Sequence, residues 1–261
     1  MLADYHVHTY YSDDSTCPME DMVLQGLRCG LDEISFTEHV DYGIKTDLNC
    51  DYEKYMAEVR QLQEKYAGKI TLRLGIEFGV QVETAAQFAA DAARYPFDFI
   101  IMSNHQVDNK EFWTYEFQKG RTQEEYQTAY YAALLQMVRC FKEYNVLGHL
   151  DMIKRYDKCG DYPDEKIMNL VEPILRQVIA DGKGIALNTS SFKYKLKDTM
   201  PSRSILQLYH DLGGHILTIG SDTHETQHLA DHFTEVRHLL REIGFKEFCT
   251  FEQRQPVFHS L

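Results

Sequence analysis

Short apolar segments alternate along the chain with longer segments that have a helical pattern of apolar residues. The strand-like segments are 3–8, 33–39, 70–80, 97–107, 146–153, 184–191 and 216–224. Amphipathic patterns that repeat about every 3.6 residues cover 19–30, 52–66, 83–94, 122–144, 164–181, 202–212 and 232–243. Strands that alternate with helices form parallel sheets, because each helix returns the chain to the side where the next strand begins. These units predict an α/β fold with one parallel sheet covered by helices.

We expect this sheet to close into a barrel rather than stay open. The sequence contains neither the GxGxxG pattern nor the P-loop by which nucleotide-binding open sheets are commonly recognised. The 261 residues suffice for one large domain, and no Ser/Gly-rich linker divides them. We therefore expect a single domain over 1–261, with the tail 248–261 forming a short closing strand.

Charge and composition exclude several classes of partner. A formal net charge of −13 argues against binding to nucleic-acid polymers or acidic membranes, because both are negatively charged. No apolar run reaches the roughly 18 residues that a membrane-spanning helix needs. The first residues lack the basic and apolar segments of a signal peptide, and the six cysteines form no CxxC pair. We expect a cytoplasmic protein with reduced thiols, and the sequence does not indicate its oligomeric state.

Histidine and carboxylate side chains occur at or near the carboxyl ends of six expected strands. His6 and His8 point to the same face of the first strand, about 7 Å apart, because side chains alternate along a strand. The later strands contribute Glu38, His39, Glu77, His105, His149, Asp151, Asp222 and His224. In a β/α barrel these strand ends form one rim, where active sites occur. We therefore expect these side chains to meet in one cluster.

The joint pattern favours a metal cluster. Taken singly, a histidine after a strand is commonly a hydrogen-bonded loop residue, and Glu77 could be a buried ion-pair partner, but such residues would not all gather on one rim. Imidazole and carboxylate ligands without thiolates suit Zn²⁺, Mn²⁺ or Fe²⁺. Because one tetrahedral ion cannot use all of these ligands, we expect two to three ions, with a carboxylate such as Glu77 bridging two of them. We expect the other histidines to be surface or packing residues, namely His210, His215, His228, His232, His238 and His259.

Six short motifs resemble those of the PHP (polymerase and histidinol phosphatase) superfamily. They are, in order, "DYHVHT", "TEH", "GIE", "NH", "GHLD" and "SDTH", and they extend from Asp4 to His224. The chain length and the segment "HLDMIKRY" are most similar to the histidinol-phosphate phosphatase branch. The resemblance implies a distorted (β/α)7 barrel that binds up to three metal ions at the carboxyl-terminal rim of its strands.

The resemblance also implies a set of metal ligands. The first metal would be bound by His6, His8, Glu77 and Asp222, the second by Glu77, His105 and His149, and the third by Asp14, His39 and His224. Asp13 is a neighbouring alternative to Asp14, where many relatives have histidine. Asp4 and Asp151 are expected to orient metal-bound imidazoles, and Glu38 could do the same or face solvent.

The implied activity is a metal-dependent phosphomonoesterase that hydrolyses L-histidinol phosphate to L-histidinol and phosphate in histidine biosynthesis. A hydroxide that bridges the metals would attack the phosphorus. Glu77, Asp222 and His39 would be catalytic, and the leaving alkoxide would be protonated by a metal-bound water, by Asp222 or by His39. The alternatives are a PHP phosphoesterase for another small phosphate, nucleotide or phosphodiester, an amide hydrolase on a similar barrel, and a non-enzymatic metal-binding or sensor protein.

Substrate-binding residues are expected near the same rim. Arg155 is the first candidate for a bidentate contact with phosphate, although it could be a surface arginine. Further candidates are Arg203, Lys195, Asn188 and Ser190. Two long segments, 108–120 and 154–165, are candidates to cover the substrate, the alternative being ordinary solvated loops. Acidic and aromatic side chains of 108–120, with Tyr42 or Phe192, could hold the amine and imidazole.

Overall fold

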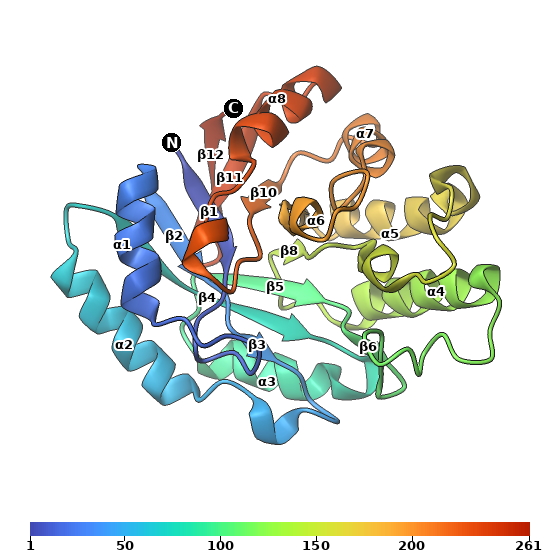
Figure 1. The fold of residues 1–261 in the computed structure, drawn as a ribbon, viewed down its shortest axis with the longest axis horizontal. Coiled ribbons are helices and arrows are strands. Elements are labelled where there is room, and N and C mark those ends of the chain that lie inside the picture. Colours follow the sequence, from blue (N-terminus) through green and yellow to red (C-terminus); the bar gives the residue numbers. More distant parts are fainter.

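Seven parallel strands form the sheet of the computed structural model, which describes residues 1–261 (Figure 1). The order of these strands in space is β1-β2-β4-β5-β8-β9-β10. Their bounds are β1 Ala3–Val7, β2 Glu33–Phe36, β4 Thr71–Gly79, β5 Phe99–Ser103, β8 Val146–Leu147, β9 Gly184–Asn188 and β10 Leu217–Gly220. Because every neighbouring pair is parallel, all carboxyl ends lie on one side of the sheet.

The sheet curls until its first and last strands meet, which makes a nearly closed, distorted barrel. Only an isolated parallel bridge joins Val7 to Thr223, with a hydrogen bond of 2.9 Å from the His8 backbone N–H to the Thr223 carbonyl. Gly220 makes this approach possible, because a Cβ atom there would lie 2.4 Å from the His6 Cβ. The prediction of a distorted (β/α)7 barrel is therefore confirmed.

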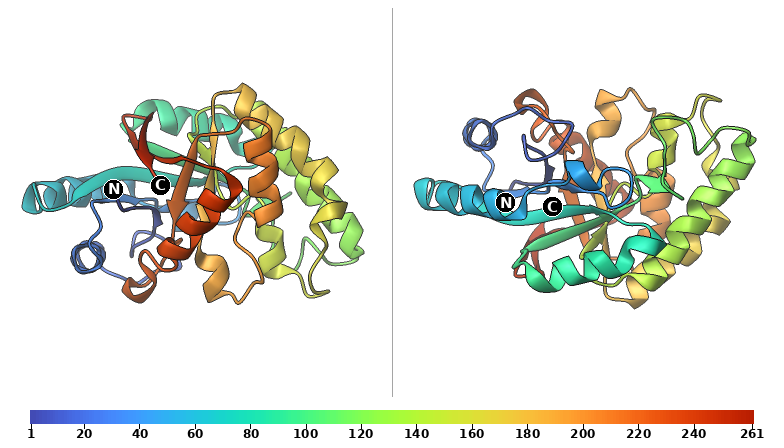
Figure 2. Two further views of the ribbon diagram at one scale, coloured as in Figure 1. Left: turned by 90° about the horizontal axis from the view of Figure 1, so that it is seen from above. Right: turned by 90° about the horizontal axis from the view of Figure 1, so that it is seen from below.

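Helices cover the outside of the barrel (Figures 1 and 2). The α-helices are α1 Met19–Cys29, α2 Tyr52–Lys65, α3 Ala85–Arg94, α4 Gln123–Cys140, α5 Met168–Ala180, α6 Ser190–Lys193, α7 Arg203–Asp211 and α8 Phe233–Ile243. The 3-10 helices are η1 Thr46–Leu48, η2 Val82–Thr84, η3 Met152–Tyr156, η4 Asp164–Lys166 and η5 Thr226–His228. No helix is both long and apolar enough to cross a membrane.

The expected strands are shorter in the structure than in the sequence pattern, because the chain turns once it reaches the rim. The segment 33–39 divides into β2 and the two-residue β3 His39–Val40, which pairs with β4. The segment 97–107 divides into β5 and β6 Gln106–Val107, and β6 pairs with β7 Lys110–Glu111 in a hairpin. The polar side chains at these turns stay buried at the rim, among them Glu38, Asn104 and His105.

The tail differs from the expected single closing strand. It forms an antiparallel hairpin of β11 Glu247–Glu252 and β12 Gln255–Ser260. Gln253 and Arg254 make its two-residue turn, both with positive φ, as such tight hairpins require. The Arg254 N–H donates to the Asp98 carbonyl, and the Asn145 side chain donates to the Arg254 carbonyl. The hairpin is thereby attached to the segments that lead into β5 and β8, away from the rim.

The hydrophobic core is one cluster of 66 buried residues. All residues of β1, β5 and β9 are buried, as expected for a parallel sheet whose two faces are both covered. Buried polar side chains gather instead at the carboxyl ends of the strands, and several of them are ionisable. Buried ionisable groups do not help a hydrophobic core, so their position at this rim indicates a functional site.

Candidate metal centre

Eight of the nine expected ligand side chains come from strand ends of the barrel. They are His6 on β1, His8 just after it, His39 on β3, Glu77 on β4, His105 after β5, His149 after β8, and Asp222 and His224 after β10. The ninth, Asp14, lies on the loop that follows β1. Four groups of three among these side chains place one ligand atom each within 4.8 Å of one another. The topology thus brings together residues more than 200 positions apart.

Glu77 is fully buried at the centre of the cluster, and its two oxygens face different histidines. Oε2 lies 3.2 Å from His6 Nε2 and 3.5 Å from His8 Nε2. Oε1 lies 3.4 Å from His105 Nε2 and 3.0 Å from His149 Nε2. Ligands on one tetrahedral ion with bonds of about 2.1 Å are roughly 3.4 Å apart. Glu77 therefore has the geometry of a carboxylate that can bridge two ions.

Asp222 completes the group around His6 and His8. Its Oδ1 lies 3.7 Å from His6 Nε2 and 3.5 Å from His8 Nε2. Its Oδ2 accepts hydrogen bonds from Arg155 Nη2 at 3.0 Å, Asn188 Nδ2 at 2.9 Å and Ser190 Oγ at 3.1 Å. Three donors on one oxygen fix the carboxylate and leave the other oxygen free to bind an ion. The Asp222 backbone has a φ of 51°, a left-handed conformation that Asp tolerates better than most residues.

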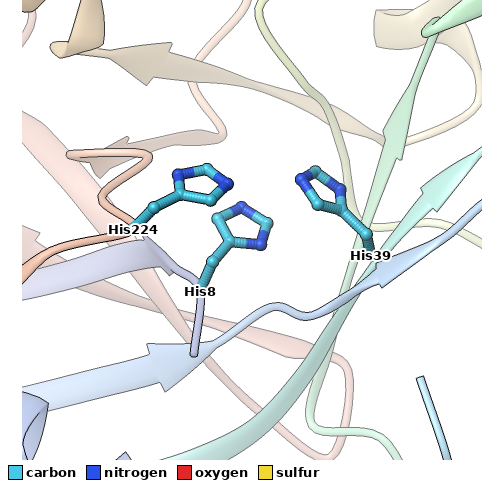
Figure 3. Close-up of side chains that lie close together, drawn as sticks. All are labelled: His8, His39 and His224. Carbon is cyan, nitrogen blue, oxygen red and sulfur yellow. The ribbon is translucent and has the colours of Figure 1, made fainter. Parts of the chain in front are cut away.

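A third group lies at the more exposed side of the cluster. His8, His39 and His224 converge from three separate elements (Figure 3), and the His8 ring stacks on His224 at 4.3 Å and on His39 at 4.1 Å. Asp14 Oδ1 lies 3.1 Å from His224 Nε2 and 3.6 Å from His39 Nε2. Asp13 instead binds Lys45 Nζ at 2.7 Å, so the structure favours Asp14 over Asp13 as the oxygen ligand. The half-exposed Asp14 makes this group the most accessible to solvent.

Metal ions fit this donor set better than hydrogen bonds do. Buried atoms that make no hydrogen bond include Nε2 of His6, His8 and His224, Nδ1 of His39 and Oε2 of Glu77. A buried polar atom without a partner costs about 1–3 kcal/mol, and so many at one place would be strongly unfavourable. Divalent ions would satisfy all of them at once, and the donors are the imidazole and carboxylate groups that transition metals bind.

The mutual influence of the buried groups is visible in their pKa values. Burial would raise the pKa of Glu77, but His6, His105 and His39 outweigh this and hold it well below its usual range. Burial lowers the pKa of His39, yet Asp14 and Glu77 reverse the effect and raise that pKa to about 9. Burial, together with His39 and His224, holds the pKa of His8 well below its usual value. The carboxylates thus remain charged and available as ligands at neutral pH.

A cavity of about 240 Å³ opens onto this cluster. Its walls combine the candidate ligands with cationic and aromatic side chains, and the non-ligand residues are Asp41, Lys45, Trp113, Met152, Arg155, Tyr156 and Tyr194. Trp113 comes from the segment 108–120, while Arg155 and Tyr156 come from 154–165. Both long segments therefore contribute to the cavity, as expected for substrate-covering loops.

Comparison with known proteins identifies the family. The sequence model of the PHP domain matches residues 4–190. A histidinol-phosphatase from Lactococcus lactis is 31% identical over 255 residues, which cover 95% of this chain and 93% of that protein. The chain belongs to the histidinol-phosphatase family of PHP-domain proteins.

Solved structures agree with this family. The crystal structure of histidinol phosphate phosphatase from Lactococcus lactis, complexed with zinc, L-histidinol and phosphate, superposes with a TM-score of 0.91 at 30% identity and 98% coverage of both chains. A structure from Listeria monocytogenes has a TM-score of 0.78 at 19% identity, covering 89% of this chain and 99% of that one, and shows the fold alone.

Not all of the expected substrate-binding residues reach the cavity of this PHP chain. Asn188 and Ser190 lie against Asp222 instead of lining the cavity, because Asp222 Oδ2 accepts hydrogen bonds from both side chains. Arg203 lies on the surface and binds Glu242 at 3.0 Å, since it begins α7 on the outside of the barrel. Lys195 is exposed and does not line the cavity.

Tyr42 and Phe192 also point elsewhere. The Tyr42 hydroxyl donates to Asp91 at 2.5 Å, and Phe192 stacks on His232 at 4.1 Å. The aromatic side chains that line the cavity are Trp113, Tyr156 and Tyr194. Of these, only Trp113 was among the aromatic residues expected to hold the amine and imidazole of the substrate.

The expected orienting carboxylates have other roles in the structure. Asp4 accepts hydrogen bonds from the backbone N–H groups of Ser221 and Ala230, and it does not contact the His6 ring. Asp151 accepts from the Ser202 N–H at 3.0 Å and pairs with Lys154 at 2.9 Å, while Nδ1 of His149 makes no hydrogen bond. Both are fully buried and fix the loops around the rim rather than an imidazole.

Asp41 is an orienting residue that the sequence did not reveal. Its Oδ1 lies 2.9 Å from Nδ1 of the buried His105, whose Nε2 faces Glu77. Gly79 leaves the space for this pair, because a Cβ atom there would lie 1.8 Å from Asp41 Oδ1. The only available signal was the position of Asp41 two residues after His39. Burial raises the pKa of Asp41, but His105 outweighs it and keeps that pKa below its usual value.

Proposed function

We propose that this protein is a metal-dependent phosphatase that hydrolyses L-histidinol phosphate to L-histidinol and phosphate. The observation that supports this most strongly is the cavity that joins the Glu77-centred cluster to Arg155. The Lactococcus lactis protein, which shares 98% of its length with this chain in superposition, binds zinc, L-histidinol and phosphate. Its ligands represent the metal and both products of the proposed reaction.

Three sets of side chains would hold the metal ions. We assign His6, His8, Glu77 and Asp222 to the first ion, Glu77, His105 and His149 to the second, and Asp14, His39 and His224 to the third. When bound, such ions supply an activated water and neutralise charge on the phosphate. Zinc is the first choice because the Lactococcus lactis structure contains it, and manganese and iron are alternatives that suit the same donors.

Arg155 is the proposed phosphate contact of the protein itself. Its guanidinium lines the cavity, donates to Asp222 Oδ2 at 3.0 Å and stacks over the Tyr194 ring at 4.0 Å. One N–H group is thus used to position a metal ligand, and the guanidinium carries further donors for phosphate oxygens. Its pKa is raised because the attraction of Asp222 outweighs burial, so the residue stays charged when it binds the dianionic ester.

The organic end of the substrate would lie against the aromatic walls of the cavity. Trp113 and Tyr156 lie 6.2 Å apart between ring centres and come from the two long segments. Flat aromatic faces bind both imidazole rings and ammonium groups, the two groups of histidinol distant from phosphate. We therefore assign substrate selection to these loops rather than to the barrel.

His39 is the better protein candidate to protonate the leaving alkoxide. Asp222 is a poor donor, because burial would raise its pKa but His6, His8 and Arg155 outweigh burial and hold that pKa well below its usual value. His39 lines the cavity, where its imidazole can carry a proton at neutral pH. It can serve in this way only in molecules whose third metal site is empty.

The experiment compares phosphate release from L-histidinol phosphate, p-nitrophenyl phosphate and the p-nitrophenyl ester of thymidine monophosphate. The proposal predicts a kcat/KM for L-histidinol phosphate about 100-fold or more above the others, because only this substrate brings both an imidazole and an ammonium group to the aromatic walls. Turnover of the other two esters without L-histidinol phosphate would retain the metal site but overturn the substrate.

The expected setting of this reaction is the cytoplasm. All six cysteines are free, and thiols persist where glutathione keeps them reduced. The proposed partner is a small phosphorylated substrate, and the acidic chain is unsuited to nucleic-acid polymers and acidic membranes.

A further inference from the structure

Ser12 lies between two of the candidate metal ligands, on the loop that follows β1. Its side chain is buried, with 2% of the residue exposed. Ser12 Oγ is 3.1 Å from His8 Nδ1, 3.0 Å from the His39 backbone nitrogen and 2.6 Å from Glu38 Oε2. Glu38, expected either to orient an imidazole or to face solvent, is fully buried and accepts hydrogen bonds from Thr9 and Ser12 rather than from an imidazole.

The directions of these hydrogen bonds follow from what each group can do. A hydroxyl has one proton to donate and can accept two hydrogen bonds. The His39 N–H must donate, so it uses one acceptor position of Ser12. Glu38 Oε2 lies 2.6 Å from Ser12 Oγ and also receives the Thr9 backbone N–H, so this carboxylate oxygen accepts and the serine proton is the one donated to it. Ser12 can therefore only accept from His8.

Glu38 is held as an acceptor by its other contacts. Its carboxylate is fully buried and receives the Thr9 backbone N–H at 2.9 Å and the Thr9 hydroxyl at 2.6 Å. A backbone hydrogen bond from Ser12 to the Thr9 carbonyl, also 2.9 Å long, closes the turn that carries both donors. Glu38, Thr9 and Ser12 thus form one rigid unit beneath the cluster.

We propose that Ser12, fixed by Glu38, is a positioning residue that keeps the proton of His8 on Nδ1. The Nε2 lone pair then points toward Glu77 Oε2 and Asp222 Oδ1, 3.5 Å away in each case. Because His8 also stacks against His39 and His224, its ring orientation affects two of the proposed metal sites. Such partners of a metal-bound imidazole set its tautomer and direction. The inference rests on the proposed metal dependence, but its readouts do not require substrate.

The test uses zinc-loaded full-length protein labelled with ¹⁵N-histidine, and compares wild type, Ser12→Ala and Ser12→Thr. Ser35→Ala is the matched control, since Ser35 is a buried serine whose hydroxyl makes no hydrogen bond. The His8 ring signals are assigned by their absence in His8→Gln. Zinc retention is measured against increasing chelator concentration.

In wild type we expect a protected His8 Nδ1 proton and an Nε2 without a proton. In Ser12→Ala the Nδ1 proton exchanges faster, and half of the zinc is lost at about 10- to 100-fold lower chelator concentration. Ser12→Thr keeps the hydroxyl and restores both properties toward wild type, and Ser35→Ala matches wild type.

Two results would overturn the proposal. One is a His8 proton on Nε2 in the wild-type protein, which decides the question even where Ser12→Ala fails to fold. The other is zinc retention in Ser12→Ala within twofold of Ser35→Ala. If the protein does not hydrolyse L-histidinol phosphate, the position of the His8 proton and the retention of zinc can still be measured. The inference and the proposed substrate can therefore fail separately.

Discussion

Arg155 serves two partners with different N–H groups of its guanidinium, the Asp222 carboxylate and the proposed phosphate. We predict that Arg155→Ala raises the KM for L-histidinol phosphate by about 10- to 100-fold, because a charged hydrogen bond contributes about 1.5–3 kcal/mol. Arg203→Ala is the control, since Arg203 binds Glu242 on the outside of the barrel. Steady-state kinetics check both variants, and an unchanged KM in Arg155→Ala would assign the phosphate contact to another residue.

Glu77 can be tested independently of the substrate. Glu77→Gln keeps the shape of the side chain but removes the charge that faces five histidines. We predict that the variant retains at least one metal ion fewer per chain than wild type and loses nearly all turnover. Elemental analysis after dialysis measures the metal, and full metal content in this variant would contradict the bridging role.

The ligands could be predicted from sequence because their positions follow from the fold. His6, Glu77 and Asp222 lie at strand ends, and a parallel barrel brings all such ends to one rim. Orienting residues do not obey such a rule. Asp4 was expected to orient an imidazole, yet it binds backbone groups, while Asp41 and Ser12 reach ring nitrogens from loops. Loop conformation decides these contacts, and no periodic pattern records it.

At the level of elements, a small ionic network fixes the loops after β8 and β9. Lys154 of η3 pairs with Asp151 at 2.9 Å and with Asp164 of η4 at 2.8 Å. Asp164 also accepts a hydrogen bond from Ser202, which precedes α7. The network thus links 154–165 to α7, next to the Arg155 that lines the cavity.

This network predicts a pH-dependent contribution to stability. Burial would raise the pKa of Asp164, but hydrogen bonds from Lys154 and Ser202 outweigh it, and the pKa is lowered on folding. A lowered pKa stabilises the folded protein above the unfolded value of about 3.9, and the contribution disappears as the pH falls through the folded value. We predict that Asp164→Asn is less stable by about 1–2 kcal/mol at pH 7, but not in acid below the folded pKa.

Urea unfolding at pH 7 and at acidic pH measures this difference. Glu172→Gln is the control, because Glu172 forms an exposed pair with Arg176 within one helix. An Asp164→Asn defect that persists unchanged at low pH would show that the loss is one of packing rather than charge.

The elements themselves were predictable, but their ends were not. Apolar periodicity placed the seven parallel strands and the seven longer helices, because burial on both faces of the sheet requires it, but it missed the four-residue α6 Ser190–Lys193. The pattern continued through His39, Gln106 and Ile153, where the structure turns into β3, β6 and η3. At the rim, the hydrogen bonds and ion pairs of polar side chains, rather than burial, decide where a strand ends. The hydrophobic pattern of the sequence does not predict these interactions.

For the whole molecule, the continuous core predicts one cooperative unit. All 66 buried core residues form a single cluster, and the β11–β12 hairpin is attached to the segments before β5 and β8. We predict that zinc-loaded protein unfolds in one transition, with coincident midpoints in circular dichroism and in fluorescence of Trp113, the only tryptophan. Separate midpoints would show that the rim, where Trp113 lies, unfolds independently of the barrel.

The acidic chain and its anionic substrate are compatible only if the site supplies positive charge. The net charge is −13, while three candidate ligands, Asp14, Glu77 and Asp222, add negative charge at the cavity. Divalent ions on these ligands would reverse the local sign and attract phosphate, as bound cations are often the largest charges in a site. Function therefore depends on the metals more than on any cationic side chain.

The most direct test is turnover of L-histidinol phosphate as zinc is added back to chelator-stripped protein. The account predicts negligible phosphate release without metal, and an increase that reaches a plateau at two to three zinc ions per chain. Undiminished turnover by fully stripped protein would contradict the assignment of this cluster as a catalytic metal centre.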